Sequence, residues 1–293
     1  MRAFYLLLAL AERCYCTQIN LPNLKQFGEQ PSDSLVIIPT YNERDNIVRM
    51  IRTVFALPHP FHILIVDDGS PDGTADLVRE LQTEFPNQLF LLERPGKMGL
   101  GTAYIQGFRW GLQEKYDYIF EMDCDFSHYP PDLVRLRTCL EAGADVAVGS
   151  RYVRGGKLEN WPLSRVLLSI GASLYVRLLT WMPVKDPTAG FVGYTKDVLQ
   201  AIDLDKIRFI GYAFQIEMKF ASYSLDFKIQ EIPITFTDRI EGISKMSKGI
   251  VKEAILGVFQ MRWSSFFSSY RQEPIAANSP AFDPQLDVSS KQR

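Results

Sequence analysis

The sequence predicts an α/β domain with a mostly parallel, twisted sheet and helices on both faces. Short apolar runs rich in β-branched residues alternate with longer segments whose apolar residues recur at helical spacing. The chain has 293 residues, which is enough for one large domain. Polar residues gather where the apolar runs end, which is typical of the carboxyl ends of parallel strands.

The elements follow in alternating order along the chain. We expect strands within 34–40, 61–70, 88–95, 116–125 and 144–152. We expect the intervening helices within 42–57, 72–85, 99–113 and 131–143, the second capped by Asp72 or Thr74. Pro131 lies near the start of the last helix and Gly143 follows its end, which fits the usual positions of these residues at helix ends.

Three segments make up the predicted domain organisation. Residues 1–33 form an N-terminal extension, residues 34–263 the folded domain and residues 264–293 a disordered tail, which lacks periodicity. The apolar start of the chain is too short to span a bilayer. We interpret it as a short helix or disordered extension in preference to a targeting signal.

Composition excludes several classes of function. The formal net charge is −2, so a general basic surface for nucleic acid is not expected. The four cysteines form no disulfide framework, and three histidines with no cysteine cluster argue against a zinc enzyme. The cysteines are Cys14, Cys16, Cys124 and Cys139, and the histidines are His59, His62 and His128.

Polar residues follow four of the predicted strands. They occupy positions 39–43, 67–70, 123–125 and 149–151. Because parallel strands end at the same edge of a sheet, these residues should share one rim. Asp123 and Asp125 suit Mg²⁺ or Mn²⁺, which bind through one or two carboxylates and substrate phosphates. A loop pair capping the next helix is the simpler alternative, but Pro130 and Pro131 separate the pair from that helix.

Other nucleotide and phosphate motifs fit less well. The chain has no P-loop, and a dinucleotide fingerprint beginning at Gly99 and Gly101 fails because Tyr104 replaces its third glycine. Asp123-x-Asp125-x-Ser127 is similar to the nucleophile motif of haloacid-dehalogenase-type phosphatases. In those enzymes the motif follows the first strand, whereas here it follows the fourth.

Six segments carry a resemblance to the inverting family 2 glycosyltransferases, and more narrowly to single-domain dolichyl-phosphate mannose synthases. The segments are "PTYNERDNI", "VDDGSPDGT", "GLGTAYIQGF", "MDCDFSH", "GSRY" and "TDRIEGISKM". The resemblance spans about residues 34–263. It implies a nucleotide-diphospho-sugar transferase fold of the GT-A type with peripheral amphipathic helices.

The resemblance also implies roles for individual residues. The donor-binding set is Pro39, Tyr41, Glu43, Val66, Asp68, Asp123, Cys124, Asp125, Arg151, Arg239 and Lys245. The acceptor-phosphate set is Arg151, Arg165 and Ser169, the metal set is Asp123, Asp125 and Ser127, and the residues closest to the chemistry are Asp125, Arg151 and Arg239. Two departures from the family pattern are Cys124 in place of alanine and Ser127 in place of glutamine, and both concern the metal's surroundings.

The implied reaction is mannose transfer from GDP-mannose to dolichyl or another polyprenyl phosphate, with inversion. A phosphate monoester has a second pKa of roughly 6, so no general base is needed to activate it. Open alternatives are a glucosyltransferase using UDP-glucose, a soluble sugar-nucleotide transferase, a non-catalytic nucleotide-binding module and the phosphatase.

A polyprenyl acceptor implies contact with a bilayer. Residues 161–182 and 244–267 combine apolar and cationic residues in a way that suits interfacial helices, although core packing is an alternative for both. Arg177 interrupts the more apolar segment, so we expect no spanning helix. We expect peripheral attachment at the cytoplasmic face of a membrane, with a small membrane-anchoring subunit as a candidate partner.

Overall fold

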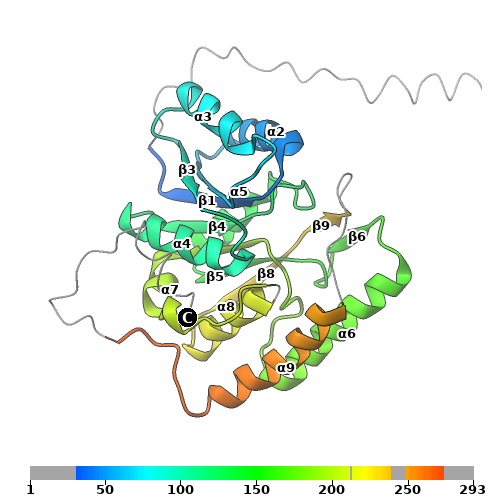
Figure 1. Cartoon of the computed structure of the whole chain (residues 1–293). Coiled ribbons are helices and arrows are strands. Elements are labelled where there is room, and N and C mark those ends of the chain that lie inside the picture. Colours follow the sequence, from blue (N-terminus) through cyan, green and yellow to red (C-terminus); the bar gives the residue numbers. More distant parts are fainter. Residues whose placement is uncertain (1–30, 212, 239–247, 274–293) are drawn as a thin grey trace, which may run out of the picture. The chain divides into compact units, whose positions relative to one another are not determined.

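The computed structural model describes residues 31–211, 213–238 and 248–273 (Figure 1). The strands are β1 (Ser34–Thr40), β2 (His62–Asp67), β3 (Leu89–Glu93), β4 (Tyr118–Glu121), β5 (Val146–Ser150), β6 (Lys157–Glu159), β7 (Val192–Thr195), β8 (Ile229–Pro233) and β9 (Thr235–Thr237). The helices are α2 (Arg44–Phe55), α3 (Thr74–Glu84), α4 (Leu100–Gln113), α5 (Asp132–Glu141), α6 (Leu163–Thr180), α7 (Lys196–Ala201), α8 (Ala213–Ser224) and α9 (Lys248–Ser264), with a short 3₁₀ turn, η1 (Leu204–Lys206).

A mixed sheet organises the described part of the chain. Its seven strands lie in the order β3-β2-β1-β4-β7-β5-β8, and β6 pairs with β9 in a separate small sheet. Strand β7 is antiparallel to both of its neighbours, while the other pairs of named strands in the described residues are parallel. The predicted mostly parallel sheet is therefore confirmed, with one antiparallel strand that the sequence did not indicate.

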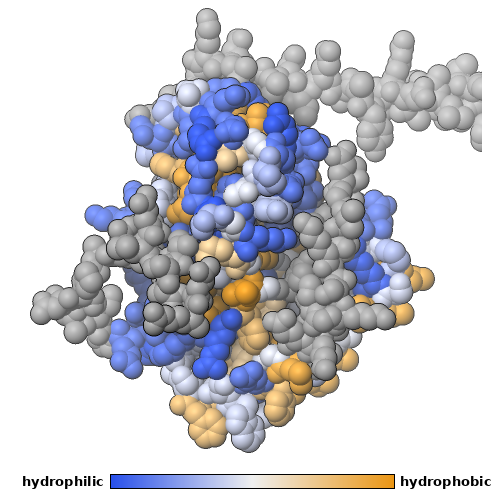
Figure 2. Space-filling model, in the orientation of Figure 1, coloured by the Kyte–Doolittle hydropathy of each residue, from blue (hydrophilic) through white to orange (hydrophobic). Residues whose placement is uncertain are grey.

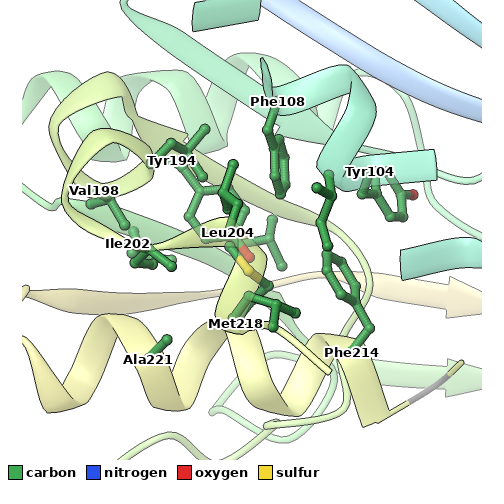
Figure 3. Packing of buried hydrophobic residues seen from close by; sticks show 14 of the residues in the cluster. Tyr104, Phe108, Tyr194, Val198, Ile202, Leu204, Phe214, Met218 and Ala221 are labelled. Carbon is green, nitrogen blue, oxygen red and sulfur yellow. The ribbon is translucent and has the colours of Figure 1, made fainter. Parts of the chain in front are cut away.

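Two hydrophobic cores lie on opposite faces of the sheet. Leu35 and Ile37 of β1 face the core that contains α4, α7 and α8, whereas Val36 and Ile38 face the core that contains α2, α3 and α5. This alternation is the period-two pattern of a strand buried on both sides. Figure 3 shows the first core, where Phe108 of α4 lies among Tyr194 of β7 and the side chains of α8.

Helix α4 packs against the sheet through glycines. A Cβ on Gly107 would lie 2.8 Å from the Ile37 side chain, and one on Gly111 would lie 2.8 Å from the Ile119 side chain. The side-chain-free surface of these glycines thus brings the helix backbone against β1 and β4. The "GLGTAYIQGF" segment therefore has a packing role in addition to its family resemblance.

The segment after α9 packs against the domain, at variance with the predicted start of the tail at 264. Tyr270 is buried, and its hydroxyl donates to Glu217 Oε1 at 3.1 Å. Its carbonyl accepts from the Asp203 main chain at 2.8 Å, and Arg271 bridges to Ile202. Residues 264–273 are therefore ordered, and residues 1–30 and 274–293 of the predicted extension and tail lie outside the described residues.

Helices α6 and α9 contact one another and expose apolar side chains. Figure 2 shows hydrophobic residues reaching the surface in the region of these helices. Among the described residues, α6 is the single helix long and apolar enough to cross a membrane by length and composition. Its 18 residues span about 27 Å, slightly less than the roughly 30 Å hydrocarbon core of a bilayer.

Candidate active site

The carboxyl ends of β1, β2 and β4 form one side of the candidate site. These strands are neighbours in the sheet, and Thr40 is in register with Asp67. Asp67 accepts hydrogen bonds from Thr40 Oγ1 at 2.7 Å, the Ser70 main chain at 2.8 Å and Ser70 Oγ at 2.6 Å. The first aspartate of the "DDGS" motif thus fixes the turn and the adjacent strand end.

Asp68, the second aspartate of that motif, is bound by a buried arginine that the sequence analysis missed. Arg94 Nε donates to Asp68 Oδ1 at 2.6 Å, while its other nitrogens donate to Thr102 Oγ1 at 2.7 Å and the Gly99 carbonyl at 3.2 Å. Burial raises the pKa of Asp68, against the opposing effect of Arg94. The signal in the sequence was a cation directly after the third strand, at the same sheet edge.

The other residues predicted to bind the donor differ in how far their side chains are buried. The side chain of Val66 is fully buried among the core residues, so it is not open to a ligand. Pro39, Tyr41 and Glu43 are half-buried and follow or end β1. Glu43 accepts from the Asn46 side-chain amide at 3.0 Å, and Lys97 lies 5.0 Å from the centre of the Tyr41 ring.

The turn after β4 carries the predicted metal residues. Asp125 Oδ1 accepts from the Ser127 main chain at 3.0 Å, across a left-handed residue at Phe126 with φ 57°. Asp125 is buried and Asp123 half-buried. This tight turn places the two carboxylates one residue apart beside β1.

Cys124 does not contribute its side chain to that site. Its thiol is buried in the core that contains α2 and α5, and burial raises its pKa well above the usual range. Glu43, Asp125 and Asp123 add to this rise, in that order, so their carboxylates lie around the same turn. The buried thiol leaves the main chain of Cys124 for the predicted contact with the metal and diphosphate.

The residues present fit a hard divalent cation held by few protein ligands. The described residues contain no group of three or more His, Cys, Asp or Glu side chains able to hold a metal ion. Ser127 Oγ is buried and has no hydrogen-bond partner among the described residues. Buried polar atoms are normally paired, so this oxygen is available to a bound ion or its water. Two carboxylates and a hydroxyl suit Mg²⁺ or Mn²⁺, which retain waters and take substrate phosphates as further ligands.

Two buried ionisable groups that influence one another were also missed. Glu121, the last residue of β4, and Lys219 of α8 are both fully buried. Lys219 Nζ donates to the Ala189 carbonyl at 2.6 Å and the Gln215 carbonyl at 2.9 Å. Burial raises the pKa of Glu121 and lowers that of Lys219, while each charge opposes the shift of the other.

The end of β5 supplies the other side of the candidate site. Arg151 Nε and Nη2 bind Asp186 Oδ2 and Oδ1 at 2.7 and 2.6 Å, and its main chain donates to Asp186 Oδ2 at 2.9 Å. Nη2 also donates to Thr188 Oγ1 at 2.7 Å. The arginine predicted to bridge donor and acceptor is thus held in a buried bidentate ion pair, so it can act on a ligand only from this fixed position.

Arg165 and Ser169 lie on α6, as predicted, and both are engaged by protein groups. Arg165 Nη1 donates to the two carboxylate oxygens of Asp238 at 2.8 and 2.9 Å, and its guanidinium lies 3.9 Å from the Trp161 ring centre. Ser169 Oγ accepts from the Tyr152 hydroxyl at 2.6 Å.

Arg151 and Arg165 lie against the same aromatic side chain. The Arg151 guanidinium is 5.8 Å from the ring centre of Trp161, which Arg165 also covers. The structure thus brings together the three residues predicted to meet the acceptor phosphate. Arg239 and Lys245, predicted for the donor phosphates, lie outside the described residues.

Comparisons with known proteins show the family to which the chain belongs. A family profile described as "Glycosyl transferase family 2" matches residues 35–203. The chain is 45% identical over 237 residues to a polyprenol monophosphomannose synthase of Mycolicibacterium smegmatis, covering 79% of this chain and 89% of that protein. It is 47% identical over 230 residues to an undecaprenyl-phosphate mannosyltransferase of Micrococcus luteus, covering 78% and 93%.

A solved structure supports the fold. Glucosyl-3-phosphoglycerate synthase from Mycobacterium tuberculosis, in complex with Mn²⁺, UDP and glucosyl-3-phosphoglycerate, matches with a TM-score of 0.56 at 15% identity, over 78% of this chain and 79% of that one. The likeness confirms the predicted GT-A-type fold. The family profile covers more than half of the chain, and the relatives are matched over most of their length; the chain belongs to glycosyl transferase family 2.

Proposed function

We propose that the protein transfers mannose from GDP-mannose to dolichyl or another polyprenyl phosphate with inversion, giving polyprenyl phosphate β-D-mannose. The observation that carries the proposal is the position of Arg165 and Ser169 on the exposed apolar helix α6, beside Arg151 at the sheet edge that also bears the carboxylates. The names of the relatives at 45% and 47% identity support both mannose and a polyprenyl phosphate.

The donor lies along the carboxyl ends of β1, β2 and β4 in this proposal. Asp68, fixed by Arg94, and Tyr41 and Glu43 line the nucleotide side. A divalent ion, Mg²⁺ or Mn²⁺, held by Asp123, Asp125 and Ser127, would act as a Lewis acid on the diphosphate of the leaving group. Arg239 and Lys245 are assigned to the donor phosphates on the family resemblance.

The site must hold the acceptor phosphate in position, but it does not need to deprotonate it. Its phosphate monoester is largely dianionic at neutral pH because its second pKa is roughly 6, so it can attack the anomeric carbon without a general base. The main obstacle is repulsion between two anions. Arg151 and Arg165 offset that repulsion, and direct in-line attack converts an α-mannosyl donor into a β-linked product.

The membrane holds the acceptor, so α6 and α9 are assigned to its surface. Leu163, Leu167 and Leu178 of α6 are more than 60% exposed, and Trp263 in the last turn of α9 and Phe267 just after it are at least 60% exposed. Exposed apolar and aromatic side chains flanked by arginines suit insertion at the headgroup level. The protein would attach peripherally to the cytoplasmic face of a membrane, and a small membrane-anchoring subunit is a further proposed partner.

A sugar-transfer assay tests the proposal. Radiolabelled GDP-mannose and UDP-glucose are each supplied with and without polyprenyl phosphate, and label in the lipid phase is measured. We expect transfer from GDP-mannose that requires the lipid and Mg²⁺ or Mn²⁺. Transfer from UDP-glucose instead would identify the glucosyltransferase alternative, and phosphate release without transfer would identify the phosphatase.

A carboxylate substitution tests the metal assignment within the same assay. Asp125→Asn removes one charge from the proposed ligand pair and should abolish most transfer while leaving the unfolding midpoint close to that of the wild type. Glu80→Gln, at an exposed position on α3, is the matched control and should retain full activity. Near-normal transfer by Asp125→Asn, with an unchanged metal response, contradicts the assignment.

A further inference from the structure

Tyr152 lies at the acceptor side of the site, although neither the sequence nor the comparisons assign it a role. It follows the end of β5 by two residues, and its main chain donates to Ser150 Oγ at 3.3 Å. Its hydroxyl reaches across to α6 and donates to Ser169 Oγ at 2.6 Å. Its ring centre is 5.3 Å from the Arg151 guanidinium. Tyr152 therefore links the strand that carries Arg151 to the helix that carries Arg165.

The hydrogen bond to Ser169 differs from the usual bonding of a hydroxyl on a helix. A helical serine or threonine commonly donates to the carbonyl four residues earlier. Ser222 of α8 does so to Met218 at 2.8 Å, and Thr180 of α6 does so to Val176 at 2.7 Å. Ser169 Oγ instead pairs with the Tyr152 hydroxyl at 2.6 Å.

Of two paired hydroxyls the more acidic one is the better donor, and a phenol, with a pKa of about 10, is far more acidic than a serine hydroxyl. Tyr152 therefore donates to Ser169, and Ser169 keeps its own proton for donation. Hydrogen bonds in such a chain polarise one another, so a donated bond from Tyr152 makes Ser169 a better donor. Ser169 lies one helical turn from Arg165 on the same face of α6, where the second donation would meet an anion bound by that arginine. The Tyr152–Ser169 pair thus adds a neutral O–H donor to the charged donors.

The surroundings of this pair favour an anionic ligand. Trp161 stacks under Arg165, and its indole Nε1 is buried with no hydrogen-bond partner among the described residues. Arg165 is about one-third exposed, as is its partner Asp238, so this ion pair is open to a competing anion. By contrast, Arg151 is nearly buried against the fully buried Asp186 and stays in place. The donors that converge here suit the oxygens of a phosphate monoester.

We propose that Tyr152 is a positioning residue for the acceptor: its hydroxyl orients Ser169, which donates to a phosphate oxygen of the polyprenyl phosphate. The inference rests on the proposed function and extends it, because it names a residue that sets affinity for the phosphate headgroup. Tyr152 acts through Ser169, so the two hydroxyls form one functional unit. The donor, on the far side of the site, is unaffected.

A double-mutant cycle in steady-state kinetics tests the proposal. Tyr152→Phe keeps the ring beside Arg151 and removes the hydroxyl alone, and Ser169→Ala removes the other hydroxyl. Each single substitution should raise the KM for polyprenyl phosphate about two- to tenfold, the range for one neutral hydrogen bond. The double variant should show about the same increase as either single variant, since the relay is already broken. The Kd for GDP-mannose should stay unchanged.

Tyr223→Phe on α8 is the matched control, because it makes the same chemical change outside the site. A merely structural role for Tyr152 would lower the unfolding midpoint without an effect on the acceptor KM of the folded enzyme. An unchanged acceptor KM in Tyr152→Phe, or increases that multiply in the double variant, overturns the proposal. If Tyr152→Phe does not fold, Ser169→Ala decides in the same way, since an unchanged acceptor KM there leaves Tyr152 nothing to orient.

Failure of the proposed function gives a different result. A wild-type enzyme that transfers no mannose to polyprenyl phosphate contradicts the function itself, before any variant is compared. A wild-type enzyme that transfers normally, with Tyr152→Phe indistinguishable from it, contradicts only the role of Tyr152.

Discussion

Asp186 is the residue whose substitution tests the described architecture most directly. Its side chain is fully buried and accepts from Arg151 at three nitrogens and from Thr188 Oγ1 at 3.2 Å. Asp186→Asn keeps the shape but removes the charge, leaving the guanidinium of Arg151, which is 9% exposed, without its counterion. Such a loss costs about 3–5 kcal/mol in buried ion pairs.

That cost is a large fraction of the free energy of unfolding of a single domain. Domains of this kind have unfolding free energies of about 5–15 kcal/mol. With a urea m-value of roughly 3 kcal/mol/M for a domain of this size, the unfolding midpoint should fall by about 1–2 M. The measurement is equilibrium urea unfolding followed by circular dichroism and tryptophan fluorescence.

Two further variants sharpen the interpretation. Glu84→Gln breaks the half-exposed pair with Arg52 and should cost less than about 1 kcal/mol. Replacing both partners, as in Arg151→Met with Asp186→Leu, should recover much of the stability lost in Asp186→Asn, because no buried charge remains uncompensated. A double variant at least as unstable as the single one refutes the reasoning from an uncompensated charge.

The same ion pair predicts a pH dependence of stability. Burial by itself raises the pKa of Asp186, but the hydrogen bonds and charge of Arg151 outweigh it and lower the folded-state pKa below the usual value. The stabilisation is therefore fully present above the unfolded-state pKa of about 3.9 and is lost as the pH falls through the lower folded value. Asp186→Asn should flatten this acid limb in unfolding titrations.

Three other predictions concern the acceptor, the packing and the membrane surface. Arg165→Ala should raise the KM for polyprenyl phosphate about ten- to a hundredfold with an unchanged Kd for GDP-mannose; weaker donor binding with a normal lipid KM contradicts the acceptor assignment. Gly107→Ala should lower stability by about 1–3 kcal/mol in thermal unfolding because its Cβ would meet Ile37. Gly171→Ala in α6, where an added Cβ would meet no atom within 4 Å outside the helix's own backbone, should instead be neutral or stabilising, and equal effects would refute the packing argument. Leu167→Ser with Leu174→Ser should reduce sedimentation with phospholipid vesicles and leave the unfolding midpoint unchanged, and unchanged sedimentation would contradict the assignment of α6.

Much of the first half of the fold was predictable because its elements are local. Strand β1 has the predicted bounds of 34–40, since its apolar run is continuous and ends in polar residues. Strand β7 was missed because its sequence, "VGYT", is short and carries no alternation. Its place in the sheet depends on pairing with β4 and β5, which precede it in the chain.

The candidate site was predictable as a set of residue types at strand ends, while the partners of those residues were not. The sequence indicates that Asp68 and Arg151 lie at the sheet edge. That Arg94 binds the first and Asp186 the second depends on three-dimensional approach, since the latter pair is 35 positions apart. Cys124 is buried because its side chain points from the turn into the core. The residue types around it in the sequence do not specify that direction.

The sheet order also dictates when each half of the site can form during synthesis. In the described sheet, strands β1 to β4 have one another and β7 as neighbours, so β1 to β4 can assemble from the first 121 residues. Strand β5 has β7 and β8 as its neighbours in the described sheet, and both are made later. Until β7 emerges from the ribosome, β4 presents an open edge, a known template for aggregation. The nucleotide half of the site can thus form before the acceptor half exists, and translational pausing after β4 has emerged and before β7 has emerged would prolong exposure of the edge that β7 later covers.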